Sequence, residues 1–136
     1  MKHWFICLAS LFGMSSLVLS AIARHALDLP ADLMSSFQVA AQYQIFHAIL
    51  LLLIALFLHL GPNFLLLAAG WLCVIGTTLF CGSIYAKIFL EAPDLTFLAP
   101  YGGISLMLAW LCLALYGIRR TLVRPLFTNN NQRRFF

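Results

Sequence analysis

Residues 39–60 read VAAQYQIFHAILLLLIALFLHL, and Gly61 and Pro62 follow them directly. A helix needs about 20 predominantly apolar residues to cross a hydrocarbon core of about 30 Å, and this stretch has that length. In lipid the backbone must satisfy its own hydrogen bonds, so a spanning segment of this kind is a helix. Gly61 and Pro62 favour a tight break at its end. The stretch therefore predicts one transmembrane helix that ends near Leu60.

Three further apolar runs approach the same length, at about residues 4–23, 64–88 and 99–118. Hydrophobic residues make up 63% of the 136-residue chain and charged residues only 9%. Typical soluble domains are about 45–50% apolar and about 25% charged, and a soluble fold of this size cannot hide so much apolar surface. We therefore expect an all-α integral membrane four-helix bundle over residues 1–118, followed by a basic tail over residues 119–136.

The charged residues are divided unevenly between the two sides of such a bundle. With four spans, the N-terminus and the tail share one side, which carries Lys2 and the five arginines that follow residue 118. The other side carries Arg24, and Lys87 near its boundary, together with all four acidic residues. Because the cytoplasmic side carries the excess of Lys and Arg, six cations against two predict that both termini are cytoplasmic. The tail suits anionic lipid headgroups, whereas no folded module presents its arginines to nucleic acid, so no nucleic-acid partner is expected.

The first apolar run has a competing interpretation. Lys2, the apolar stretch and the Ala-Ile-Ala sequence of residues 21–23 resemble a signal peptide with its cleavage site. The run is longer than a usual signal core of about 7–15 residues. Gly13, Ser16 and Ser20 also recur at spacings that suit packing against another helix. We expect the first span to be retained.

Residues 24–38 do not read as a simple loop. Asp28 can cap a helix, Pro30 suits a first helical turn, and apolar residues from Leu33 onward recur at helical spacing. We expect a short interfacial helix here that leads into the second span.

Small residues predict where the helices pack closely in the membrane, because they let two backbones approach each other. Gly13 lies in the first span, and Gly76, Thr78 and Gly82 lie in the third. Thr78 and Gly82 are four residues apart, a spacing that places both on one helix face.

A patch of polar residues occupies the outer end of the second span. The apolar stretch that follows it is too short to cross the bilayer alone, so some of these side chains must enter the lipid boundary. Tyr43 and Gln44 precede His47 by four and three residues, so the three side chains share one helix face. His25 lies at a similar depth at the end of the first span. Because a polar group facing lipid is costly unless it has a partner, we expect His25 to face Gln44 and His47 inside the bundle.

Ser83 and Tyr85, near the outer end of the third span, are the expected additional partners of this patch. An interfacial aromatic belt explains Tyr85 equally well. The candidate polar network or ligand site therefore comprises His25, Tyr43, Gln44, His47, Ser83 and Tyr85.

Four short strings resemble, in order and in register, a known family of bacterial inner-membrane proteins. The strings are Ala23-Arg24-His25-Ala26-Leu27, Tyr43-Gln44-Ile45-Phe46-His47-Ala48, Phe80-Cys81-Gly82-Ser83-Ile84-Tyr85 and Pro100-Tyr101-Gly102-Gly103. The family is the uncharacterised YgdD/YwdK-like group of four-span proteins, and the resemblance covers roughly residues 10 to 118. It implies an uncleaved first span and a location in the bacterial plasma membrane, and it supplies no settled activity.

Three classes of function agree with these residues. We expect a non-catalytic accessory, assembly or interaction protein, with a membrane-protein partner or further copies of the chain, in which the polar patch fixes how the helices pack. A second class is a cofactor or small-molecule site, because two imidazoles at one depth can ligate haem iron or bind a quinone. A third is a subunit of an oligomeric transporter.

Catalytic and metal chemistry have little support in the sequence. The four cysteines sit inside apolar runs and form no CxxC pair or Cys/His cluster, so neither a zinc site nor a thiol redox motif is indicated. No acidic residue falls inside a predicted span, which disfavours a hydrolytic centre and a proton relay. We expect no enzyme activity and no metal site, and the sequence names no cofactor.

Overall fold

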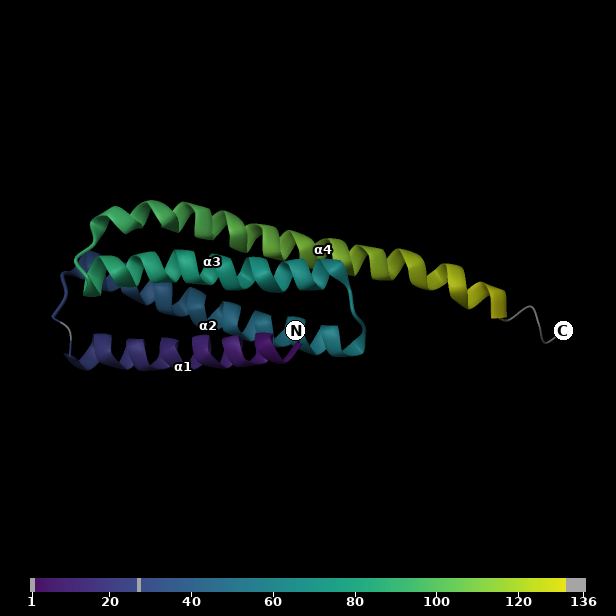
Figure 1. Cartoon of the computed structure of the whole chain (residues 1–136), viewed down its shortest axis with the longest axis horizontal. Helices are drawn as coiled ribbons and strands as arrows, with labels where there is room; N and C mark the ends of the chain where they lie inside the picture. Colours follow the sequence, from purple (N-terminus) through teal and green to yellow (C-terminus); the bar gives the residue numbers. More distant parts are fainter. Residues whose placement is uncertain (1, 27, 132–136) are drawn as a thin grey trace.

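The computed structural model describes residues 2–26 and 28–131, and the side chains of residues 3–25 and 28–121. Every element in this part of the chain is helical, as the sequence predicts (Figure 1). The elements are α1 (Lys2–Ala26), α2 (Ala31–Leu60), α3 (Phe64–Phe89), the short 3-10 helix η1 (Pro93–Phe97) and α4 (Leu98–Asn131).

Local sequence explains where the helices begin and end. The Oδ1 atom of Asn63 accepts a hydrogen bond of 2.8 Å from the backbone N–H of Leu65 and so caps the start of α3. Pro30 immediately precedes α2, and Pro93 opens η1. Glu91, between α3 and η1, has a φ of 49°, a left-handed conformation that turns the chain after the helix.

Each of the four long helices in the described part of the chain is long and apolar enough to cross a membrane. Large apolar side chains such as Leu56, Met107 and Trp110 lie exposed on the outside of the protein. Such a surface suits lipid and not water, so the chain is a multi-pass membrane protein.

The separate interfacial helix expected within residues 24–38 is not confirmed. α2 begins at Ala31 and continues without a break to Leu60. Nothing after Pro30 interrupts the helical pattern, and Phe37 is already buried in the first turns. The residues that precede the predicted span therefore form one continuous helix with it.

The fourth helix also runs further than its predicted span. α4 continues to Asn131, so the first part of the predicted tail is helical, and Figure 1 shows this helix extending beyond the other three. Of the tail arginines, Arg119 and Arg120 have described and exposed side chains. The side chains of Arg124, Arg133 and Arg134 lie outside the described residues.

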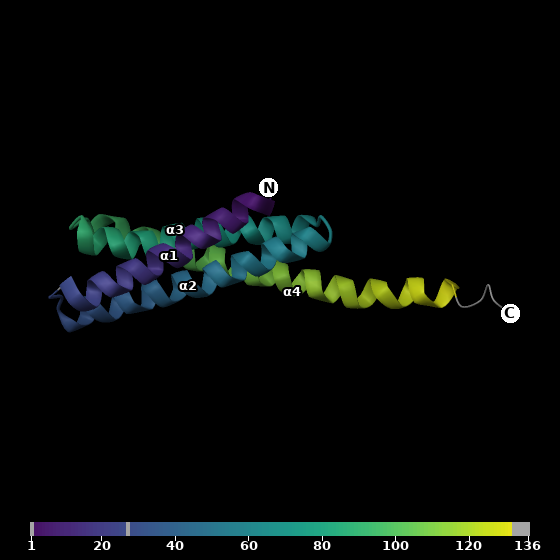
Figure 2. The same ribbon diagram turned by 90° about the horizontal axis from the view of Figure 1, so that it is seen from below.

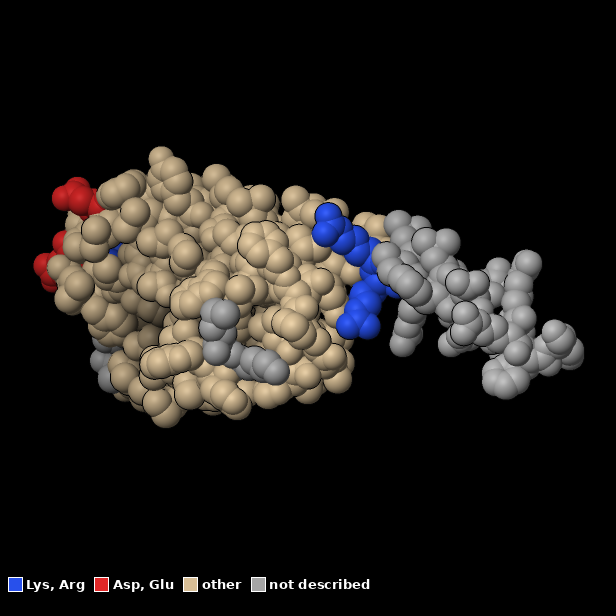
Figure 3. Space-filling view, turned by 45° about the vertical axis from the view of Figure 1, so that its right-hand side comes forward, with Lys and Arg blue, Asp and Glu red and all other residues tan. Residues whose placement is uncertain are grey.

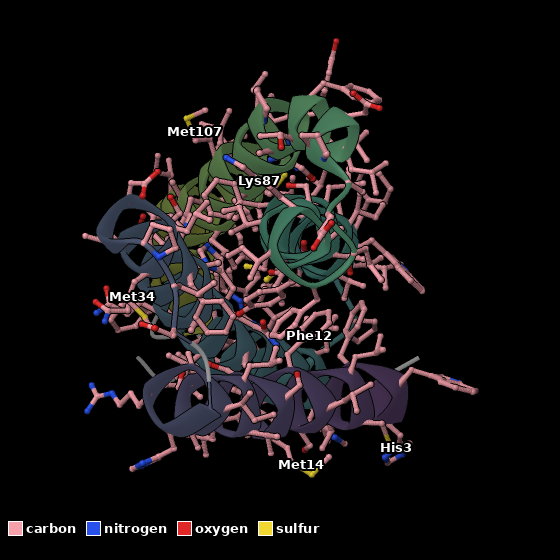
Figure 4. All side chains as sticks on the ribbon, turned by 90° about the vertical axis from the view of Figure 1, so that its left-hand side faces the viewer. His3, Phe12, Met14, Met34, Lys87 and Met107 are labelled. Atoms are coloured by element: carbon pink, nitrogen blue, oxygen red, sulfur yellow. The ribbon has the colours of Figure 1, made fainter. Side chains whose placement is uncertain are left out.

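The helices form an open arrangement in which α3 is central. α3 packs extensively against α4 and against α2, and α1 packs against α2. Viewed end-on, α3 lies between α4 and α1, while Phe12 points from α1 into the bundle and Met14 points away from it (Figure 4). α1 begins beside α3, where Phe5 meets Trp71 edge to face at 5.6 Å between ring centroids, and ends beside α2 (Figure 2). α2 and α4 barely touch each other in the described residues.

The core lies where α1, α2 and α3 meet, with α4 contributing from one side. Phe5, Leu51, Ile54, Leu66 and Cys73 are fully buried there. Dispersion and close packing hold such a core together, because lipid is as apolar as the side chains that leave it.

Two glycines set the closest helix crossing. A Cβ atom on Gly76 of α3 would lie 2.7 Å from a methyl carbon of Leu106, and a Cβ on Gly102 of α4 would strike the backbone N of Phe80. A Cβ on Gly13 would lie 3.7 Å from the Cδ1 atom of Ile45 in α2, an ordinary van der Waals contact, so α1 and α2 are also close there. Gly13 and Gly76 thus both lie at helix contacts.

Within the described part of the chain, Thr78 and Gly82 do not lie at a helix contact, so helix packing at these two residues stays a prediction. Both are exposed, and a Cβ on Gly82 would meet nothing within 4 Å. The hydroxyl of Thr78 donates to the carbonyl of Val74 in its own helix. The face of α3 that packs on α4 carries Gly76, and Thr78 lies about 200° further around the helix.

The charges lie at the two ends of the protein. Figure 3 shows acidic residues at one end, with a small basic patch beside them, and a cluster of basic residues at the other end. The surface between the two ends is uncharged in this view. The arginines lie at the end where α1 begins and α2 and α3 are joined.

Candidate functional site

Two polar side chains bind α1 to α2. The Nε2 atom of Gln44, which is buried, donates to the Oγ atom of Ser15 at 2.6 Å and to the carbonyl oxygen of Phe12 at 2.9 Å. The hydroxyl of Ser16, also buried, donates in the opposite direction to the carbonyl oxygen of Ala41 at 2.8 Å. These bonds cross between the same two helices from both sides and fix their relative rotation and depth.

Similar bonds join the remaining neighbouring helices. From α3, the thiol of Cys81 donates to the carbonyl of Ala40 at 3.2 Å, and the thiol of Cys73 to the carbonyl of His47 at 3.5 Å. From α4, the hydroxyl of Ser105 donates to the carbonyl of Leu72 at 2.9 Å. Each helix in chain order is thus linked to the next by a side chain that reaches a backbone carbonyl.

His47 is buried, and one of its ring nitrogens is free. Its Nδ1 atom lies 2.7 Å from the carbonyl oxygen of Tyr43, one turn earlier, and because that oxygen can only accept, Nδ1 carries the proton. In a neutral imidazole Nε2 then presents a lone pair, and this atom is buried without a partner among the described residues. His47, Tyr43 and Trp110 line an apolar cavity of about 350 Å³ between α2 and α4.

Tyr43 joins His47 on this face, as their spacing predicts. The two rings stack with their centroids 6.0 Å apart, and the Tyr43 ring also meets Phe80 of α3 at 5.2 Å. Tyr43 is otherwise exposed, so it covers the histidine from the outside of the bundle.

His25 does not join this group, contrary to the expectation. It is exposed at the end of α1, whereas Gln44 binds α1 at Ser15, about ten residues or roughly 15 Å earlier along the helix. Ala23 is the residue that α1 buries at this end. His25 lies about 200° further around the helix and so points away from the bundle.

A crevice of about 180 Å³ lies between the outer ends of α1 and α2, and Arg24, Gln38 and Gln42 are among the residues that line it.

Ser83 and Tyr85 are buried or partly buried but do not reach the other polar residues. The hydroxyl of Ser83 donates to the carbonyl of Phe80 in its own helix at 2.9 Å. The ring of Tyr85 packs on Phe37 with 5.2 Å between centroids. Its hydroxyl is buried and has no partner among the described residues.

The interior contains polar residues that the sequence analysis did not select. Cys73, Thr77 and Cys81 are buried on one face of α3, and both thiols bind α2. Their spacing of four residues places the three side chains on a shared face. The sequence does not reveal their role, because a cysteine in an apolar run is also typical of a small hydrophobic residue. Within the described residues, no group of three or more His, Cys, Asp or Glu side chains is placed to hold a metal ion.

The sequence of this chain is similar to a family and to several membrane proteins. Residues 19–103 match the model of the family described as "Protein of unknown function (DUF423)". The UPF0382 membrane protein of Haemophilus influenzae is 35% identical over 86% of this chain and 94% of its own length. The UPF0382 membrane protein YwdK of Bacillus subtilis is 25% identical, covering 85% and 96%. The UPF0382 inner membrane protein YgdD of Escherichia coli is 25% identical, covering 87% and 92%. No solved structure matches the chain.

Proposed function

This chain belongs to the DUF423 family, whose relatives are the UPF0382 membrane proteins, and we propose that it serves as a non-catalytic accessory, assembly or interaction protein in the bacterial plasma membrane. The observation that carries this proposal is how the buried polar side chains are used. The Nε2 atom of Gln44 and the hydroxyls of Ser16 and Ser105 each donate to the backbone or a hydroxyl of a neighbouring helix. The Oε1 atom of Gln44 is buried without a partner among the described residues. Such bonds make one packing of the helices more favourable than others.

The exposed face of α3 supports an interaction role. Thr78 and Gly82 lie one turn apart on that face, and a Cβ at Gly82 would meet nothing within 4 Å in the described part of the chain. Helices in membranes associate through small residues of this kind, because lipid supplies no hydrophobic force between them. We propose that a helix of a partner, or of another copy of the chain, packs here.

A photoreactive amino acid at position 82 tests this role in the native membrane. We expect a discrete adduct with a protein. The matched control is the same amino acid at position 13, where the side chain faces Ile45 within the chain, so an intermolecular adduct should not form. Adducts with lipid alone at position 82 would contradict the interaction role.

The distribution of charge supports a topology with both termini in the cytoplasm. Arg119 and Arg120 lie at the end of the protein where α1 begins. Arg24 and Lys87 lie at the opposite end, together with the acidic residues. In the sequence, six Lys and Arg residues belong to the side of the termini and two to the other side. The side of a membrane protein that is richer in Lys and Arg lies in the cytoplasm.

One observation favours a second function, the binding of a small molecule. The Nε2 atom of His47 is buried without a partner among the described residues, and His47 lines the cavity of about 350 Å³. An imidazole whose other nitrogen donates to a carbonyl is a common metal or haem ligand. His25 is exposed, so the two-histidine ligand set that the sequence suggested is not assembled within one chain. An absorbance spectrum of the purified protein tests whether the bound molecule is haem. A Soret band would support haem binding, and the absence of a Soret band would exclude it.

A further inference from the structure

We propose that the groove between the C-terminal halves of α2 and α4 binds one anionic phospholipid, with an acyl chain in the groove and the phosphate at Arg120. This inference goes beyond the accessory role and does not depend on it. The groove exists because α2 and α4 both pack on α3 and their backbones approach each other little. The rings of Phe57 and Tyr116 meet in it with centroids 6.2 Å apart. Its cavity has a volume of about 500 Å³.

The walls of the groove are apolar. α2 contributes Leu53 and Phe57 among other residues, and α4 contributes Leu113, Tyr116 and Gly117. An apolar groove that is open to the side of a membrane protein faces lipid chains. These chains fill the groove at no desolvation cost.

The length of the groove corresponds to one leaflet of the bilayer. The residues that line it lie between Leu50 and Leu60 on α2 and between Leu113 and Thr121 on α4. At a rise of 1.5 Å per residue, these segments extend about 12–15 Å, and half of a hydrocarbon core of about 30 Å is about 15 Å. A lipid of the leaflet nearest the termini can therefore place its chain along the whole groove.

Arg120 closes the end of the groove at the membrane surface and gives the site its charge. Its guanidinium lies over the ring of Tyr116, 5.7 Å from the centroid, in a cation–π contact that holds the side chain at the groove. No carboxylate pairs with Arg120 within the described part of the chain, because the acidic residues lie at the other end of the protein (Figure 3). A planar guanidinium matches the oxygens of a phosphate group.

The absence of a side chain at Gly117 provides a test that leaves the packing of the helices unchanged. A Cβ on Gly117 would meet nothing within 4 Å, so Gly117→Leu can fill the groove without displacing another residue. Gly103 is its matched control, because it lies on the same helix, also has open space around it, and does not line the groove. Arg119, which is exposed and does not line the groove, is the matched control for Arg120.

The experiment titrates the full-length protein in mild detergent with phosphatidylglycerol, and with phosphatidylcholine for comparison, and counts retained lipids by native mass spectrometry. We expect one phosphatidylglycerol per chain to be retained preferentially. Arg120→Gln and Gly117→Leu should each lower its affinity about tenfold, the first through loss of a charge-assisted contact and the second through occupation of the groove. Arg119→Gln and Gly103→Leu should leave it unchanged.

Four results would overturn the proposal. Equal retention of phosphatidylcholine would show that the charge of the headgroup does not determine binding. Equal effects of Arg120→Gln and Arg119→Gln would show that the arginines attract anionic lipid without a specific site. A Gly117→Leu variant that binds as well as Gly103→Leu, or a second copy of the chain that occupies the groove, would show that no lipid chain lies there.

Discussion

A Cβ atom on Gly102 of α4 would lie 2.9 Å from the carbonyl oxygen of Gly76 on α3, a separation that real Cβ contacts essentially never show. The backbones of the two helices therefore touch at this point, and α4 is held against the centre of the protein by a contact that only glycine allows. Much of the remaining architecture follows from it, since α4 reaches the bundle through α3.

Gly102→Ala should therefore destabilise the protein, because the added methyl group would strike the backbone of Phe80. We expect a loss of about 1–3 kcal/mol, as for other overpacked sites. Reversible unfolding in mixtures of mild detergent and sodium dodecyl sulfate measures it. The neighbouring Gly103→Ala is the control, and it should leave the stability unchanged or raise it by up to about 1 kcal/mol, because alanine favours the helix and the space is open. Equal effects of the two variants would refute the close crossing.

Gln44→Met should weaken the association of α1 with α2. The variant keeps the size of the side chain but loses the bonds to Ser15 and Phe12. Interhelical hydrogen bonds in membranes average about 0.6 kcal/mol and reach about 1.7, so we expect a loss of about 1 kcal/mol in the same unfolding assay. Gln42→Met, at an exposed position on the same helix, should have no measurable effect. A larger loss at Gln42 than at Gln44 would be incompatible with the network.

His47→Phe separates packing from ligand chemistry. The Nε2 atom of His47 is buried without a partner among the described residues, and an aromatic ring of similar shape removes that cost. We expect stability equal to or greater than that of the natural protein, and His25→Phe, at an exposed site, should leave stability unchanged. A marked loss of stability in His47→Phe, together with the loss of a small molecule that the natural protein retains, would favour the ligand site instead.

Fusions to alkaline phosphatase, which is active only outside the cytoplasm, test the proposed topology. The charge at the ends of the helices predicts an inactive enzyme when it is fused after residue 136. Fusion after residue 29, in the connection between α1 and α2, should give an active one. The opposite pattern would show that the arginines of α4 do not determine the orientation.

The number and positions of the spans could be predicted because length and composition alone decide whether a segment crosses a membrane. The face that each helix turns to its neighbours could not be predicted equally well. Gln44 and His47 are polar residues within a largely apolar segment, so their burial was predictable from the cost of exposing them to lipid. The partner of Gln44 was not predictable, because depth suggested His25 whereas the crossing of α1 and α2 brings Ser15 to it.

The boundaries of the second helix show a similar limit. Residues 31–38 are amphipathic enough to suggest a helix on the membrane surface, and only the tertiary packing of Phe37 against α3 shows that they continue the span. Thr78 and Gly82 had the spacing of a packing motif, but spacing does not reveal whether the packing partner belongs to the same chain.

We propose that the buried polar residues serve packing and that the protein acts through other membrane proteins. Extraction of the natural protein from its membrane with its surrounding lipid, followed by mass measurement and an absorbance spectrum of the same sample, tests this most directly. We expect a discrete assembly, either several copies of the chain or a stoichiometric complex with another protein, without absorbance in the visible range. A single chain with a bound chromophore would contradict the account.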